Sequence, residues 1–168
     1  QRPGHLDAHG ADAGGAAEKL AACRELGAEV LVNYQEADFV EAVREATDDG
    51  VDVILDLVGA AYLDRNLQAL AKDGRLVVIG LMGGRESEIN LGLMLQRRLS
   101  VQATSLRGRT RKDKARIVAA VRENLWQKVT AGQIRPVVHE VLPWEKAQEA
   151  HGLLKASEHI GKVVLRVD

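Results

Sequence analysis

Helical and extended segments alternate along most of this chain, and that alternation most limits what the chain can fold into. Apolar residues recur at helical spacing in three early segments, and each segment is followed by an apolar run of strand length. The runs are apolar on both faces, as strands of a buried parallel sheet are. The sequence therefore predicts an α/β protein with a doubly wound parallel sheet and right-handed crossovers. The predicted helices are 18–26, 39–46 and 63–70, and the strands after them are 28–34, 51–59 and 75–79.

The second half of the chain continues with helices and strands of less regular order. Pro136 and Pro143 disfavour a helix around them, so the stretch between them is expected to be extended. The longest predicted helix should turn Ile117, Val118, Val121 and Leu125 inward. The predictions are a short helix over 91–99, a strand over 100–106 at a sheet edge, a helix over 113–130, extended chain over 134–143, a helix over 145–156 and a strand over 162–167.

Composition limits the class of protein and its partners. The chain has 168 residues, of which 46% are hydrophobic and 28% charged, enough for one domain with a core. A formal net charge of −1 provides no general attraction for nucleic acid or an anionic membrane. The apolar runs are too short for a membrane-spanning helix, and the first residues lack the apolar stretch of a signal peptide. We therefore expect a cytoplasmic protein with neither a nucleic-acid nor a membrane partner.

Residues 1–15 differ from the rest of the chain. The segment QRPGHLDAHGADAGG has neither helical nor strand periodicity and is rich in glycine, alanine and aspartate. Such composition does not favour a strand or a packed helix. We expect this segment to be poorly structured.

The stretch RLVVIGLMGG, residues 75–84, resembles a buried strand that ends in a glycine turn. Open α/β sheets bind ligands at the carboxyl ends of their strands. Neither G-x-G-x-x-G nor G-x-x-x-x-G-K-[ST] occurs in the chain, so this turn is not a phosphate-binding loop of either kind. Gly80 and Gly83 have no side chains, so backbone there is expected to come close to a ligand.

No other residue pattern predicts a reaction. His5 and His9 are four residues apart but lie in the irregular first segment, and Cys23 has no second cysteine and is expected to pack on a helix. Asp52 and Asp56 share a strand, where Asp56 is expected to accept hydrogen bonds from the following loop. The basic run 106–114 is either a solvated approach to a helix or an anion contact.

Two residues near strand ends allow two interpretations. Lys19 lies in the first turn of its helix, where its charge opposes the helix dipole, and Tyr34 ends a strand. Each is either an ordinary surface residue or part of a ligand site. Residue patterns by themselves leave both interpretations open.

Several longer stretches resemble one family. EKLAACRELGAEVLVNYQEADFVEAVREAT, VDVILDLVGAAYLDRNLQALAKDGRLVVIGLMGG, NLGLMLQRRLSVQATSLR and HIGKVVL are similar to the zinc-free quinone oxidoreductase branch of the medium-chain dehydrogenase/reductases, most of all its p53-inducible type. The likeness runs from residue 16 to 168. It implies an incomplete Rossmann-type domain over 16–134, then a segment over 135–168 that returns to a catalytic domain. The amino-terminal catalytic domain, the first Rossmann strand and its phosphate turn have no counterpart in the chain. Before EKL, the family pattern LGAxVxxTAGSxEKL stands against LDAHGADAGGAAEKL, so residues 1–15 are interpreted as replaced sequence.

The resemblance also implies a site and an activity. Lys19 and Tyr34 would meet the 2′-phosphate of NADPH, and no catalytic residue or metal ligand is assigned. The reaction would be hydride transfer from NADPH to a quinone or a small activated alkene. A homodimer would form through the edge strand 100–106. The alternatives are a non-catalytic remnant that serves as a dimerising module, and an enoyl reductase of the same superfamily. The other implied cofactor-binding residues are Leu57, Gly59, Ile79, Gly80, Leu81, Met82, Thr104, Ser105 and Leu106.

Overall fold

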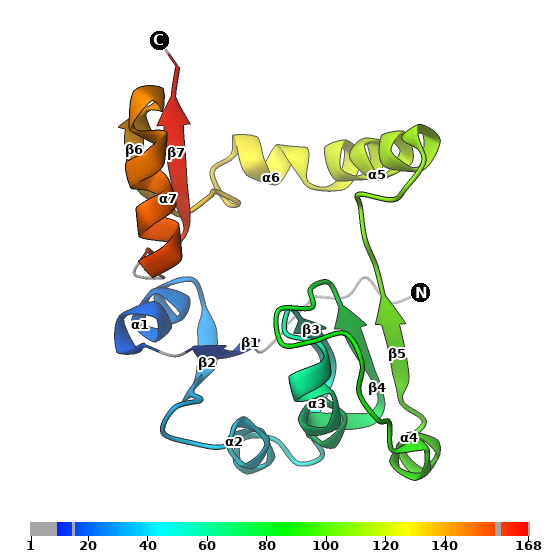
Figure 1. Cartoon of the computed structure of the whole chain (residues 1–168). Coiled ribbons are helices and arrows are strands. Elements are labelled where there is room, and N and C mark those ends of the chain that lie inside the picture. Colours follow the sequence, from blue (N-terminus) through cyan, green and yellow to red (C-terminus); the bar gives the residue numbers. More distant parts are fainter. Residues whose placement is uncertain (1–9, 15, 157–158, 168) are drawn as a thin grey trace. The chain divides into compact units, whose positions relative to one another are not determined.

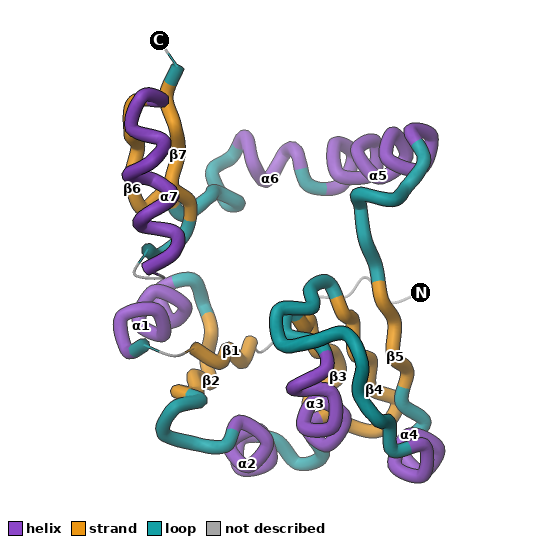
Figure 2. The backbone as a smooth tube through the Cα atoms, in the orientation of Figure 1, coloured by secondary structure: helices purple, strands orange, loops and turns teal. Residues whose placement is uncertain are grey.

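The computed structural model describes residues 10–14, 16–156 and 159–167. The chain divides into two compact units, Gln1–Arg107 and Gly108–Asp168. Helices and strands alternate through most of the first unit (Figure 2). The boundary that the family resemblance implies, at residue 135, stays a prediction.

The first unit contains five strands and their connecting helices in its described residues, labelled in Figure 1. In chain order they are β1 (Gly10–Gly14), α1 (Ala17–Glu25), β2 (Ala28–Asn33), α2 (Phe39–Ala46), β3 (Val51–Asp56), the 3-10 turn η1 (Ala60–Tyr62), α3 (Leu63–Ala69), β4 (Leu70–Val78), α4 (Leu91–Arg97) and β5 (Ser100–Ala103).

All strand pairs of the first unit are parallel. β1 pairs with β2, and a second sheet has the order β3-β4-β5, so β5 is an edge strand as expected. The predicted α/β class with parallel strands is confirmed. The structure differs in one respect, because the described strands of this unit form two sheets instead of one.

The structure also differs from the expectation for residues 1–15 at positions 10–14. These five residues, GADAG, form β1 and pair with β2 from Gly10 opposite Ala28 to Gly14 opposite Asn33. Parallel pairing uses backbone groups, so a neighbouring strand can hold a segment whose side chains have low β propensity. The remainder of that segment lies outside the described residues.

Two apolar clusters form the core of the first unit. One joins Val32 of β2 to the buried face of α2 and to Ala69 at the end of α3. The other joins Leu67, Leu70 and Leu76, none of which has any exposed surface, to Leu99 before β5. Ile54 of β3 packs against both clusters. The core therefore lies between α2, α3 and one face of the strands.

Two helix ends are explained by residues next to them in the sequence. Asp38 caps α2, and its Oδ1 accepts a hydrogen bond of 2.7 Å from the backbone N–H of Val40. Gly27 follows α1 with a φ of 102°, the left-handed conformation that ends many helices. The apolar spacing of α2 is confirmed as well, because Phe39, Val40 and Val43 are buried.

Two predicted helices end elsewhere than expected. Leu70 belongs to β4, because the helix stops at Ala69 and the strand begins at once. The predicted helix 113–130 is two helices, α5 (Arg111–Asn124) and α6 (Trp126–Thr130), which meet at Leu125. Its expected inward face is wrong, since α5 has no buried residue and Val118 is 65% exposed. Apolar periodicity is local, whereas burial requires a second element against that face.

The second unit continues after these two helices with β6 (Val138–Pro143), the 3-10 turn η2 (Trp144–Lys146), α7 (Ala147–Ala156) and β7 (Lys162–Arg166). β6 and β7 pair in parallel, and α7 connects them (Figure 1). The predicted extended stretch, final helix and final strand are confirmed in type. Over the described residues of both units, no helix is long and apolar enough to cross a membrane.

Candidate functional site

The loops after β3 and β4 form one connected structure at the carboxyl ends of these strands. Backbone N–H groups of the second loop donate to carbonyl groups of the first: Ile79 to Asp56 at 2.8 Å, Met82 to Leu57 at 3.2 Å, and Gly83 to Val58 at 2.7 Å. In return, Ala60 N–H donates to the carbonyl of Gly84 at 3.2 Å. The strand pairing thus continues past the formal strand ends, and the two loops hold each other in place.

The buried carboxylate of Asp56 fixes the first of these loops. Its two oxygens accept hydrogen bonds from the backbone N–H groups of Val58, at 2.8 Å, and Gly59, at 2.9 Å. Asp56 is 5% exposed, so these hydrogen bonds stabilise a charge that burial would otherwise penalise. The expectation that Asp56 binds the following loop is confirmed.

The glycines of this region are explained by contact between the loops. A Cβ at Gly80 would lie 2.6 Å from the carbonyl oxygen of Leu57, and one at Gly83 would lie 2.6 Å from Cγ1 of Val58. Gly59 has a φ of 82°, which side-chain-bearing residues rarely adopt. At Gly80 and Gly83 the close neighbour is therefore the other loop of the chain. This packing does not test the predicted contact of Gly80 and Gly83 with a cofactor, which stays a prediction.

Four exposed apolar side chains lie on the paired loops. Leu57 is 53% exposed, Ile79 42%, Leu81 51% and Met82 86%. The hydrogen bonds between the loops do not require these apolar side chains to face water. Ligand sites are lined mainly by apolar side chains. The structure brings these four predicted site residues together with Gly59 and Gly80.

The segment after β5 joins the same edge of the sheet. The backbone N–H of Thr104 donates to the carbonyl of Val78 at 3.1 Å, which places the end of β5 beside the end of β4. Ser105 and Leu106 follow at exposed positions. The carboxyl ends of β3, β4 and β5 therefore lie at one edge, as the parallel order requires.

Lys19 and Tyr34 lie at the carboxyl edge of the other sheet of this unit. Lys19 is in the first turn of α1, directly after β1, and is partly buried. Tyr34 follows the last residue of β2 and is 45% exposed. Because Gly14 pairs with Asn33, the two strands end at the same level. An ammonium and a phenol at such an edge can bind an anion.

Sequence reasoning missed the side chains that fasten α2 to the start of α3. The guanidinium of Arg65 lies 4.4 Å from the ring centroid of Phe39 and 5.3 Å from that of Tyr62, and it pairs with Asp38 at 3.1 Å. The hydrogen bond from Val40 N–H, together with Arg65, holds the pKa of Asp38 below its usual range. No periodic pattern indicates such a cluster, because its members come from the start of α2, the turn η1 and α3.

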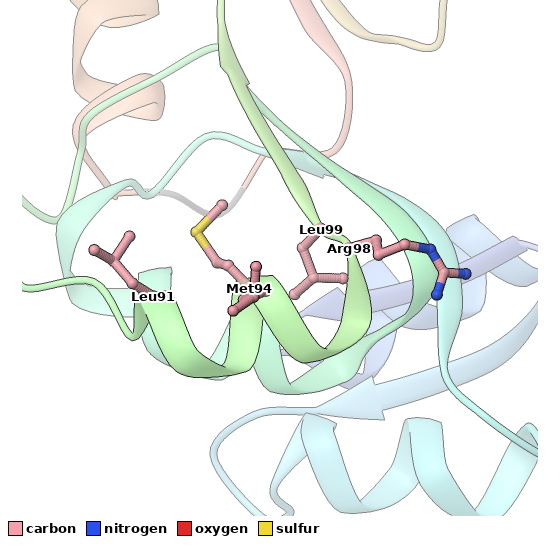
Figure 3. A pocket seen from close by; sticks show the side chains of 5 residues that line it. Leu91, Met94, Arg98 and Leu99 are labelled. Carbon is pink, nitrogen blue, oxygen red and sulfur yellow. The ribbon is translucent and has the colours of Figure 1, made fainter.

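A shallow apolar hollow lies beside α4, away from the predicted site residues. Leu91, Met94 and Leu99 line it together with Leu95 and the stem of Arg98 (Figure 3). The guanidinium of Arg98 pairs with the carboxylate of Asp73, which lowers the pKa of Asp73 and raises that of Arg98. The hollow is lined by side chains of one short helix and its end, and it contains no group for a reaction.

Metal ligands are not grouped in the described ranges 10–14, 16–156 and 159–167. No cluster of three or more His, Cys, Asp or Glu side chains that could hold a metal ion occurs there. The zinc-free character of the chain stays a prediction.

The family model and the most similar known proteins point to the same family. Residues 26–165 match the model of a family described as zinc-binding dehydrogenase. The chain is 30% identical over 154 residues to quinone oxidoreductase-like protein 2 of Bos taurus, covering 91% of this chain and 44% of that protein. It is 28% identical over 141 residues to the quinone oxidoreductase of Rattus norvegicus, covering 83% of this chain and 41% of that protein. The chain thus spans less than half the length of these relatives.

Solved structures agree with the sequence relatives. An NAD-dependent alcohol dehydrogenase is 32% identical with a TM-score of 0.78, and the match covers 95% of this chain and 44% of that one. A 2-haloacrylate reductase is 26% identical with a TM-score of 0.78, covering 94% and 49%. A mycobacterial quinone oxidoreductase is 27% identical with a TM-score of 0.77, covering 95% and 49%.

Proposed function

Since the chain belongs to the zinc-binding dehydrogenase family, and within it to the quinone oxidoreductases of the medium-chain dehydrogenase/reductase superfamily, we propose that it serves the NADPH-dependent reduction of a quinone. The family uses a nicotinamide cofactor, so the choice of NADPH, the quinone and the reaction are the proposal. The chain would provide the carboxyl edge of a nucleotide-binding sheet. We also expect it to act in the cytoplasm.

The observation that carries the proposal is the group of exposed apolar side chains on the paired loops. Leu57, Ile79, Leu81 and Met82 are exposed on a backbone that cross-loop hydrogen bonds hold in place. Such a surface fits the flat, weakly polar face of a nicotinamide ring, and a ring packed there would be shielded from water. When bound, NADPH supplies the hydride, and the side chains of this edge position it.

Lys19 and Tyr34 support the choice of NADPH over NADH. Both lie at the carboxyl edge of β1 and β2, where doubly wound sheets bind the adenosine ribose. An ammonium group there would pair with a 2′-phosphate, which NADH lacks. Ala16, where the family pattern has a serine, offers no hydroxyl to the same phosphate.

A fluorescence titration tests this assignment. We expect NADPH to bind the chain saturably, and Lys19→Ala to weaken NADPH about 10-fold, because one charge-assisted contact is lost, with NADH unaffected. Lys112→Ala, on the second unit, is the matched control and should leave both affinities unchanged. Equal losses for NADPH and NADH, or no binding by the unaltered chain, would reject the proposal.

A second candidate substrate is an activated alkene. The similarity to a 2-haloacrylate reductase favours it, because the compound in that protein's name contains a carbon–carbon double bond conjugated to a carboxylate. Quinones and such alkenes both accept hydride at a carbon conjugated to a carbonyl group. Steady-state rates with a benzoquinone and with 2-haloacrylate would show which of the two is preferred. A preference for 2-haloacrylate would favour a reductase of double bonds, the class to which the enoyl reductase alternative belongs.

The edge strand β5 supports a proposal about assembly. It is the last strand in the order β3-β4-β5, and Gln102 and Ala103 are exposed at its end. Unpaired backbone groups at a sheet edge can pair with the same strand of a second copy. We expect a homodimer through 100–106, which is also what the non-catalytic alternative requires. Gln102→Pro should abolish such a dimer, which size-exclusion chromatography with light scattering would measure.

A further inference from the structure

We propose that Arg65 is a positioning residue, which fixes the spacing between the two edges of the proposed cofactor site. One edge, at the ends of β1 and β2, contains Lys19 and Tyr34, and the other consists of the paired loops after β3 and β4. The inference goes beyond the proposed function and rests on it in one respect, because it treats these two edges as one site.

The two edges belong to different sheets. In the described residues β1 pairs with β2 alone, and the other sheet of the first unit has the order β3-β4-β5. Hydrogen bonds among these strands therefore do not set the distance between the edges. An apolar cluster that includes Val32 of β2 and reaches Ile54 of β3 holds α2 near both sheets, but apolar contact is not directional.

Arg65 of α3 provides a directional contact with the start of α2. Its guanidinium carbon lies 4.4 Å from the ring centroid of Phe39 and 5.3 Å from that of Tyr62, and the two ring centroids are 5.5 Å apart. Its Nη2 lies 3.1 Å from Oδ2 of Asp38. A planar guanidinium that stacks on rings and pairs with a carboxylate fixes orientation as well as distance. We call these four residues the Arg65 clamp.

The stability that the Arg65 clamp contributes does not by itself explain it. Nε of Arg65 is buried and has no hydrogen-bond partner in the part of the chain that the structure describes. A buried N–H without a partner lowers stability. The pair with Asp38 is partly exposed, and exposed ion pairs contribute little. The geometry that the clamp imposes on α2 and α3 is therefore the better explanation.

A hydrogen-bonded turn joins the Arg65 clamp to the edge of β2. Asn33, the last residue of β2, accepts a hydrogen bond at its carbonyl from the N–H of Ala37 at 2.9 Å, and at its Oδ1 from the N–H of Gln35 at 3.1 Å. The turn that begins at Tyr34 thus has a fixed form up to Asp38, where the clamp begins.

A second set of hydrogen bonds joins the Arg65 clamp to the paired loops. The N–H of Tyr62 donates to the carbonyl of Gly59 at 3.0 Å, and the N–H of Gly59 donates to the buried carboxylate of Asp56 at 2.9 Å. The N–H of Ala60 donates to the carbonyl of Gly84 in the loop after β4 at 3.2 Å. Movement of α3 against α2 would therefore move these loops relative to the edge of β2.

A distance measurement tests the role without any ligand. Spin labels at Gln35→Cys and Met82→Cys, both exposed positions, report the distance between the edges by double electron–electron resonance, with Cys23→Ala to remove the native thiol. We expect one narrow distance distribution in this labelled chain. Arg65→Met should broaden it or shift its maximum, because the ring contacts and the ion pair are lost together.

Two further variants keep this measurement decisive. Arg65→Lys keeps the charge without the planar group and should broaden the distribution as well. Arg44→Met, at an exposed arginine of α2 outside the clamp, is the matched control and should leave the distribution unchanged. An unchanged distribution in both Arg65 variants, or an equal change in the Arg44 variant, would overturn the proposal.

Ligand binding to the unlabelled chain adds a readout that a merely structural role would not give. Adenosine 2′,5′-bisphosphate and reduced nicotinamide mononucleotide are the two halves of NADPH, and each would bind one edge. We expect Arg65→Met to weaken NADPH about 10-fold and each half less than about twofold, because linked groups lose effective concentration when their sites are wrongly spaced. Arg44→Met should change none of these affinities. A loss for either half as large as that for NADPH would overturn the proposal.

The outcomes separate the positioning role from the proposed cofactor. A distance distribution that depends on Arg65, with NADPH binding that depends on it too, supports both proposals. A distribution that depends on Arg65 in a chain that binds no NADPH upholds the positioning role and rejects the proposed cofactor. NADPH binding with a distribution that ignores Arg65 upholds the cofactor and rejects the positioning role.

Discussion

At the scale of single residues, the close packing of the loops after β3 and β4 depends on a glycine, which has no Cβ, at position 80. Gly80→Ala would place a Cβ 2.6 Å from the carbonyl oxygen of Leu57, and backbone cannot yield as a flexible side chain can. We expect a loss of about 1–3 kcal/mol in the free energy of unfolding, the usual cost of overpacking. Urea denaturation would measure it.

The control for this substitution is Gly152→Ala. Gly152 lies in α7, and no atom lies within 4 Å of a Cβ built there. Alanine should stabilise that helix by up to about 1 kcal/mol. If both variants unfold at the urea concentration of the unaltered chain, contact between the loops does not require glycine at position 80.

Asp38 predicts a dependence of stability on pH. Its pKa is lowered in the folded chain, first by the hydrogen bond from Val40 N–H and also by Arg65. Its contribution is therefore present at neutral pH and is lost as pH falls from the ordinary aspartate range through the lowered folded-state value. Asp38→Asn keeps the capping oxygen and removes the charge.

We expect Asp38→Asn to lower stability at pH 7 by less than about 1 kcal/mol, because the ion pair is partly exposed. The difference from the unaltered chain should disappear as the pH falls from 7 to below the lowered folded-state pKa of Asp38. Thermal unfolding across this range would measure it, with Asp48→Asn as the control at an exposed position. A difference that grows as pH falls would contradict the assigned cause.

At the scale of elements, the stability of the first unit depends on the packing of α3. Leu67 has no exposed surface and joins α3 to Leu70 and Leu76 of β4. Leu67→Ala should reduce the free energy of unfolding by about 2–5 kcal/mol, since it removes contacts and leaves a cavity. Leu95→Ala, on α4 at an 83% exposed position, is the matched control and should change it by less than about 0.5 kcal/mol. Comparable losses in the two variants would contradict the assigned core.

The helices also differ in how far their sequence periodicity predicts burial. α2 has an apolar face and buries Phe39, Val40 and Val43. α5 has an apolar face as well, yet Val118 and Val121 are 65% and 43% exposed. The difference is that β2 and β3 pack against α2. The apolar spacing within α2 gives no information about these neighbours. Periodicity states which face of a helix can be buried, and neighbours decide whether it is.

At the scale of the whole molecule, exposed apolar surface predicts self-association. In the second unit, Val138, Val141, Val164 and Leu165 of the paired strands β6 and β7 are between 38% and 52% exposed. The family resemblance implies exposed apolar faces at both Val163 and Val164; Val164 is exposed, whereas Val163 is partly buried. Val141 and Val164 pair across the two strands and share one face, and an exposed apolar face of this kind favours contact between molecules.

We expect light scattering to give a mass above that of the monomer, and Val141→Lys with Val164→Lys to lower it, because these two residues share one exposed face. Gln127→Lys, at an exposed polar position of α6, is the control for the added charge. A monomeric unaltered chain, or a mass insensitive to the double variant, would show that the β6–β7 surface does not cause association.

The sequence by itself determines the local structure of this chain. The α/β alternation, the capping of α2 by Asp38, the glycine after α1 and the hydrogen bonds of Asp56 to its loop all depend on residues a few positions apart. For that reason the types of most elements, and the edge at which the candidate site lies, were predictable before any packing was known.

Only the tertiary structure decided which surfaces are buried and which strands are paired. GADAG has little β propensity and is a strand because β2 bonds to it, and Gly80 is required because Leu57 lies against it. The division of the parallel strands into separate sheets, with Val53 and Leu55 exposed, is likewise invisible in local spacing. Burial and pairing are properties of two segments that the chain brings together, so their physical cause lies in neighbours distant in sequence.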